Sequence, residues 1–145
     1  GAIPPEIGDL KQLRYLYLGD NGLQGLIPKS ISQLSNLQIL SLRGNSLKGD
    51  VVPELGSLTA LQTLSLRDNH LTNGIPPELG QLTGLKHLFL NNNKLTGPIP
   101  EELSNLEELE QLFLADNALE GPIPASFGRL VLLEELVLSG NGFTG

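Results

Sequence analysis

The sequence contains no cysteine, methionine or tryptophan, and its only aromatic residues are two tyrosines and four phenylalanines among 145 residues. Without cysteine, the chain forms no disulfide, thiolate metal site or cysteine nucleophile of its own. It also lacks any asparagine followed two places later by serine or threonine, the acceptor pattern for N-glycosylation. Together these absences favour an intracellular compartment, with an extracellular receptor ectodomain as the alternative.

Long apolar runs and basic patches are missing as well. No run approaches the roughly 18 residues that cross a bilayer, so we expect no membrane insertion by this segment. The net charge is -7, and residues 97–145 hold nine acidic side chains against the single cation Arg129. Residues 1–96 hold seven acidic side chains against eight basic ones. This distribution offers no surface for a phosphate backbone, so nucleic acid is not an expected partner.

What the sequence does contain is a repeat. The pattern LxxLxLxxNxLxG begins at Leu13 and recurs every 24 residues, at Leu37, Leu61, Leu85, Leu109 and Leu133. Counting that leucine as position 1, the leucines at positions 4 and 6 alternate with variable residues, which predicts one short strand per repeat. The apolar residues at positions 19 and 22 suit a 3₁₀ or short helical turn. One repeat alone cannot bury enough apolar surface, so the copies must stack into a solenoid.

Position 9 is asparagine in every copy: Asn21, Asn45, Asn69, Asn93, Asn117 and Asn141. An asparagine side chain can both donate and accept hydrogen bonds. A stacked column of them can therefore satisfy the backbone groups that a turn leaves unpaired. We interpret this column as a structural ladder.

The stretches LTGPIPEEL and LEGPIPASF extend the pattern to LxGxIPxxL. With these motifs the sequence resembles the leucine-rich repeat family, in its plant-type subclass of 24-residue repeats. The resemblance implies an α/β repeat solenoid, a right-handed superhelix with a concave parallel sheet and convex 3₁₀ or short helical turns. Two residues depart from the pattern, Asn73 at the glycine of position 13 and Val52 at the proline of position 16. Both are expected to affect only a local turn.

The phase of the repeat divides the chain into a single array. We expect a partial repeat at 1–12, complete repeats at 13–36, 37–60, 61–84, 85–108 and 109–132, and a partial repeat at 133–145. Neither end has a polar capping repeat. The chain is therefore expected to be a piece of a longer array in a larger protein, and its open ends offer a route to end-to-end association.

No part of the sequence predicts catalysis, a cofactor or a metal site. The segment GNGFTG at 140–145 fits GxGxxG, but its residues already serve as repeat positions. His70 and His87 have no further ligand at metal-binding spacing. The carboxylates of EELSNLEELE are best explained as a solvated face.

The outward face of the predicted sheet is the candidate binding surface. Four of the six aromatic residues lie on it, and aromatic and arginine side chains are the usual anchors of interfaces. The candidate residues are Tyr15, Tyr17, Ile39, Arg43, Arg67, His87, Phe89, Gln111 and Phe113. A competing interpretation is that aromatic pairs on adjacent strands only stabilise the sheet. Arg43 and Arg67 are neighbours in one column, either neutralised by Asp20 and Asp68 or free to bind a carboxylate or phosphate of a ligand.

The resemblance implies a module that recognises a protein or peptide, as the sensor part of a receptor-like or immune-type signalling protein. Two alternatives stay open at the level of the sequence. One is the sensor array of an intracellular protein, similar to leucine-rich-repeat GTPases of the ROCO type or to nucleotide-binding receptors. The other is a scaffold or inhibitor without a diffusible ligand.

Overall fold

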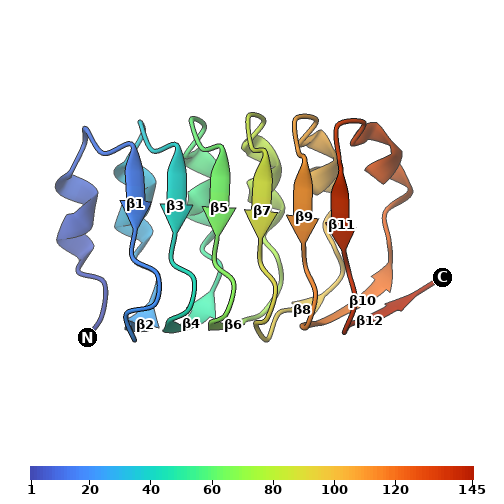
Figure 1. The fold of residues 1–145 in the computed structure, drawn as a ribbon, viewed down its shortest axis with the longest axis horizontal. Coiled ribbons are helices and arrows are strands. Elements are labelled where there is room, and N and C mark those ends of the chain that lie inside the picture. Colours follow the sequence, from blue (N-terminus) through green and yellow to red (C-terminus); the bar gives the residue numbers. More distant parts are fainter.

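The computed structural model describes all 145 residues, which form one solenoid with a parallel sheet on one face and 3₁₀ helices on the other (Figure 1). The sheet has six strands in the order β1-β3-β5-β7-β9-β11. These strands are β1 (Tyr15–Tyr17), β3 (Ile39–Ser41), β5 (Thr63–Ser65), β7 (His87–Phe89), β9 (Gln111–Phe113) and β11 (Glu135–Val137).

In the register of this sheet, residues at the same repeat position lie directly opposite one another on adjacent strands. Leu40 pairs with Leu16 on one side and with Leu64 on the other. Because successive side chains of a strand point to opposite faces, these leucines all enter the core, and the residues before and after them face outward. The expected solenoid with its concave parallel sheet is confirmed.

A five-residue 3₁₀ helix forms the back of each repeat. The helices are η1 (Pro5–Asp9), η2 (Lys29–Gln33), η3 (Pro53–Ser57), η4 (Pro77–Gln81), η5 (Glu101–Asn105) and η6 (Ala125–Arg129). Each follows a residue in extended conformation, usually proline. Val52 takes φ -65° and ψ 128° there, close to the φ -70° and ψ 134° of Pro28. The substitution at position 16 thus leaves the entry into the helix unchanged. No helix in the structure has the length and apolar character that crossing a bilayer would require.

Two short lateral sheets run along the edge between the concave face and the back. One consists of β2 (Gln24–Leu26), β4 (Ser46–Asp50) and β6 (His70–Thr72), and the other of β8 (Thr96–Gly97), β10 (Ala118–Pro122) and β12 (Gly142–Thr144). They adjoin at Asn73, whose φ of 64° resembles the 78° of Gly49 at the same repeat position. Asparagine tolerates this left-handed conformation better than most residues. The backbone connection persists, since the Thr96 N–H donates to the Asn73 carbonyl over 2.9 Å.

The core is one continuous cluster of 32 buried residues, all leucine, isoleucine or valine. It runs through all the repeats, and only its ends are open to solvent. In the last repeat Leu136 is 42% exposed, whereas Leu88 at the same position is fully buried. Burial of the leucines in the central repeats therefore depends on a neighbour on each side.

The asparagine at position 9 links each repeat to the one before it. The side-chain nitrogen of Asn93 donates to the carbonyl oxygens of Leu66 and Leu90, over 3.0 and 3.1 Å. Its side-chain oxygen accepts the N–H of Leu71 over 3.0 Å. The same bonds recur at Asn45, Asn69, Asn117 and Asn141, at the point where the chain leaves the sheet. One side chain thus pairs backbone groups of two repeats.

A second close contact between repeats lies on the back, where position 20 is often glycine. A Cβ atom on Gly80 would lie 2.4 Å from the carbonyl oxygen of Glu102 in the following repeat. Gly8 and Gly56 meet the next repeat in the same way. Gly128 has nothing within 4 Å of the corresponding position. Glycine at position 20 therefore allows the backs of successive repeats to approach.

We predict that Asn93→Ala lowers the free energy of unfolding by about 1 to 3 kcal/mol, because it leaves buried backbone groups unpaired. The measurement is urea denaturation followed by circular dichroism. The control is Asn105→Ala, at an exposed asparagine outside the ladder, for which we expect a change within about 0.5 kcal/mol. Equal losses for the two variants would contradict a special role of position 9.

We further predict that Gly80→Ala destabilises the fold by about 1 to 3 kcal/mol, since the added methyl group must displace the backbone of the next repeat. Gly128→Ala is the matched control at the same repeat position. Because its methyl group meets open space, its melting temperature should equal that of the parent or exceed it. If both variants melt alike, the approach of Glu102 to Gly80 does not limit stacking.

Candidate ligand-binding site on the concave face

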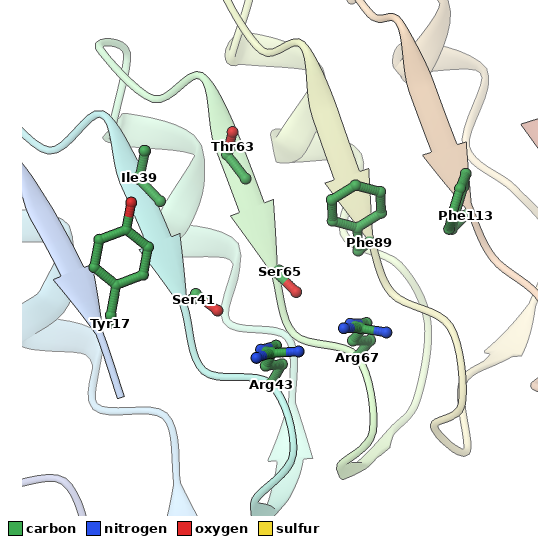
Figure 2. A pocket seen from close by; sticks show the side chains of 9 residues that line it. All are labelled: Tyr17, Ile39, Ser41, Arg43, Thr63, Ser65, Arg67, Phe89 and Phe113. Atoms are coloured by element: carbon green, nitrogen blue, oxygen red, sulfur yellow. The ribbon is translucent and has the colours of Figure 1, made fainter. Parts of the chain in front are cut away.

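A column of unequal side chains shapes the middle of the concave face. At position 5 the strands carry Tyr17, Ser41, Ser65, Phe89 and Phe113, in that order across the sheet. The two serines are small and lie between large aromatic residues. The result is a shallow depression of about 450 Å³, open to solvent, over β1 to β9 (Figure 2).

Nine side chains line the depression: Tyr17, Ile39, Ser41, Arg43, Thr63, Ser65, Arg67, Phe89 and Phe113. Six of them belong to the candidate set from the sequence, and the depression brings those six together. Ser41, Thr63 and Ser65 were not in that set, because small polar residues are weak signals for binding. The place of the two serines between Tyr17 and Phe89 in the position 5 column is the signal that could have identified them, and Thr63 lies between Ile39 and His87 at position 3.

Aromatic rings form one wall of the depression. The rings of Phe89 and Phe113 meet edge to face, with centroids 5.0 Å apart and an interplanar angle of 65°. His87 stacks on Phe89 at a centroid distance of 6.1 Å and an angle of 13°. Such pairs stabilise the sheet to some degree. Phe89 and Phe113 nevertheless stay only partly buried, so part of each ring is left facing solvent.

Arg43 and Arg67 form the lower edge of the depression as drawn in Figure 2. Both arginines form ion pairs: the Asp20 carboxylate lies 3.3 Å from the Arg43 guanidinium, and the Asp68 carboxylate lies 3.9 Å from that of Arg67. The first alternative raised by the sequence is therefore present in the free protein. These pairs are well exposed and contribute about 0 to 1 kcal/mol each. A guanidinium group has five N–H donors, so a ligand can still compete for both arginines.

Three residues of the candidate set lie outside the depression. Tyr15 is 51% exposed at the first strand of the sheet. The side-chain amide of Gln111 donates to the Glu135 carboxylate over 2.6 Å. His87 lies behind Phe89, against which it stacks. Position 2 of the repeats changes from Arg14 at the first strand to Glu134 at the last.

The family model for the leucine rich repeat matches residues 3–47 and 59–119. Since this is more than half of the chain, the protein belongs to the leucine-rich repeat family, and the LxGxIPxxL motif is that of the plant-type repeat. No curated protein matches the sequence significantly.

Solved structures of plant receptor ectodomains are similar to this chain. The ectodomain of the receptor kinase GASSHO1/SCHENGEN3 from Arabidopsis thaliana, in complex with CASPARIAN STRIP INTEGRITY FACTOR 2, is 41% identical with a TM-score of 0.97. The Arabidopsis receptor kinase HAESA, in complex with the peptide hormone IDA and the co-receptor SERK1, is 38% identical with a TM-score of 0.96. Each comparison covers 99% of this chain, but only 17% and 24% of the receptor chain.

A shorter solved chain gives a more complete comparison. The BIR3–SERK2 complex from Arabidopsis thaliana contains a chain that is 38% identical, with a TM-score of 0.81. The match covers 90% of this chain and 69% of that one. The similarity therefore extends from small parts of long receptor chains solved with a ligand to most of a shorter chain in the BIR3–SERK2 complex.

Proposed function

We propose that this chain is the peptide-binding part of a receptor ectodomain, and that its ligand lies in the depression on the concave face. The observation that carries the proposal is the open aromatic wall of Phe89 and Phe113 beside a low floor of two serines. Partly exposed phenylalanines on a solvated sheet are the kind of anchor that interfaces bury. Two of the similar receptors were solved with bound ligands, which supports the same role here.

The two arginines give the proposed ligand a preferred chemistry at one edge. Their acidic partners are exposed, so exchanging such a partner for an anion on the ligand costs little. We infer that Arg43 and Arg67 orient the ligand through a carboxylate or phosphate, while the phenylalanines supply most of the affinity. In this proposal every residue of the site serves to bind the ligand. We therefore infer a recognition module without catalysis.

The other functions considered from the sequence are less well supported. A scaffold without a diffusible ligand gives no reason for an open aromatic wall. An intracellular sensor array is not favoured by the similar solved structures, which are receptor ectodomains. We therefore propose an extracellular location, although the lack of cysteine and of glycosylation sites points the other way.

An antibody raised against this chain tests the location. We expect it to label intact, unpermeabilised cells of the source organism, because an ectodomain faces the outside. An antibody against a cytosolic protein serves as the control for intact membranes. Labelling that appears only after permeabilisation would place the chain inside the cell and remove the receptor proposal.

Peptide binding is tested with peptides selected against the whole 145-residue chain from a random library of linear 12-residue peptides displayed on phage. We predict that changing Phe89 and Phe113 together to serine weakens binding of a selected peptide by about 30-fold or more, equivalent to about 2 kcal/mol. Fluorescence anisotropy of the labelled peptide gives the Kd. Neither phenylalanine is buried in the core, so the double variant should keep its parallel sheet and melt cooperatively.

The matched control changes Glu101 and Glu102 together to serine, on the opposite face of the solenoid in η5. This variant should bind the peptide as the parent does. The proposal is wrong if no peptide can be selected, or if the selected peptides bind the phenylalanine double variant as tightly as the parent.

A further inference from the structure

Hydrogen-bonding atoms without partners gather around one phenylalanine of the concave face. Four buried side-chain polar atoms in the chain lack a hydrogen bond: the hydroxyl oxygens of Ser65 and Ser126, Nδ1 of His87 and Oδ1 of Asn91. Ser126 lies on the back, in η6. The other three are immediate neighbours of Phe89. Such a concentration at one residue sets this place apart from the rest of the solenoid.

The register of the sheet explains why these groups surround Phe89. Ser65 is its direct partner on β5. His87 and Asn91 stand two residues before and after it, so their side chains emerge on the same face. The His87 ring lies 6.1 Å from the Phe89 ring, and Figure 2 shows the Ser65 hydroxyl on the side of β5 that faces β7. Phe89 is thus the large side chain that stands between the three residues in the repeat.

Buried polar groups are normally paired, because an unpaired one has lost its water without gaining a partner. The same chain satisfies its ladder asparagines fully, with Asn69 and Asn93 both buried and both bonded on each side of the amide. The fold thus has the means to pair buried amides. Ser65 is only 5% exposed and still has no partner. The difference between the paired asparagines and the unpaired Ser65 hydroxyl is explained if a bound ligand supplies the missing hydrogen-bond partner.

We propose that Ser65, His87 and Asn91 form an amide-binding site for the peptide ligand, with the Phe89 ring as its movable cover. This inference rests on the proposed function. On binding, the ring turns toward the adjoining depression, where the small Ser41 and Ser65 leave it room. The Ser65 hydroxyl then donates to an amide carbonyl of the ligand. Oδ1 of Asn91 and Nδ1 of His87 accept amide N–H groups.

The spread of the three atoms identifies the kind of ligand. His87 and Asn91 are four residues apart, or about 13 Å along an extended strand at about 3.3 Å per residue. One small polar group cannot reach both side chains. A peptide repeats N–H and C=O groups along its length, so a stretch of about four residues reaches all three. A cationic donor is disfavoured, since the cation Arg67 stands two residues after Ser65 and at the same repeat position as Asn91.

A first measurement uses the free protein, with Ser65→Ala compared with Ser104→Ala. Ser104 is the control, since it is 3% exposed and its hydroxyl donates to the Glu101 carbonyl oxygen over 2.6 Å, so its loss should lower the melting temperature. If the Ser65 hydroxyl is unpaired, Ser65→Ala should melt at the temperature of the parent or slightly above. A fall of more than about 2 °C would show that the free protein already satisfies this hydroxyl, for instance through water, and would overturn the proposal.

A second measurement uses the selected 12-residue peptide whose binding depends on Phe89 and Phe113. Ser65→Ala and Asn91→Leu should each weaken its binding about 3- to 10-fold, the usual effect of losing one hydrogen bond. Ser126→Ala, which removes an equally unpaired hydroxyl on the back in η6, should change the Kd less than 2-fold. If the phenylalanine double variant loses binding while Ser65→Ala and Asn91→Leu do not, the amide site is wrong and the proposed function stands. If the phenylalanines themselves do not matter, the proposed function fails first.

The amide can come from the peptide backbone or from an asparagine or glutamine side chain of the peptide. N-methylation of single backbone amides removes the first source, and replacement of each asparagine or glutamine by alanine removes the second. The site is supported, and the source of the amide identified, if one series of modified peptides loses affinity for the parent protein but not for the Ser65→Ala variant. Full affinity in both series overturns it.

Discussion

The side-chain amide of the repeated asparagine is the interaction on which the rest of the solenoid depends. Asn69 accepts the N–H of Leu47 over 3.0 Å and donates to the carbonyl of Leu42 over 3.0 Å, both in the preceding repeat. It also donates to Leu66 of its own repeat over 3.1 Å. These backbone groups lie where the chain leaves one sheet strand and enters the lateral strand of the same repeat. A repeat is therefore fully hydrogen-bonded only with its neighbour in place, and that requirement adds to the burial of leucine.

Stacking in one register turns the concave face into a grid of positions. Each outward residue has fixed neighbours, one repeat to either side and two residues along its own strand. The contact between Phe89 and Phe113 and the low floor at Ser41 and Ser65 follow from that grid. The leucines beneath are nearly invariant in type, so the outward residues can differ from repeat to repeat without disturbing the core. Binding chemistry and folding are thereby separated within every strand.

The fold could be predicted from the sequence because the leucine spacing and the asparagine column recur at the same positions in every repeat. Leucine spacing predicted the strands, their register and the core, and the asparagine column predicted where the turns would need hydrogen bonds. Asn73 and Val52 depart from the motif, yet asparagine can adopt φ of 64° and valine the extended conformation of proline. Local departures with compatible backbone preferences leave the array unchanged.

The site was less predictable, because it depends on side-chain torsions that a repeat pattern does not determine. Sequence spacing placed Asp20 within reach of Arg43, but not whether the carboxylate would face the guanidinium or solvent. Asp20 has a φ of 60°, a turn conformation that directs its side chain in a particular way. The unpaired atoms around Phe89 depend likewise on individual rotamers. The columns were evident from the sequence, whereas the hydrogen bonds within them were not.

The ladder also makes the two sides of a repeat chemically different. On its C-terminal side, each repeat presents backbone groups that need a partner from the next repeat, such as the N–H of Leu119. On its N-terminal side, each repeat presents the asparagine amide that supplies this partner, such as Asn141 for Leu119. Two like sides cannot complete each other, so a symmetric pairing of two chains through equal ends would leave these groups unsatisfied. Only head-to-tail stacking reproduces the bonds, and a head-to-tail interface of this kind builds open arrays instead of closed dimers.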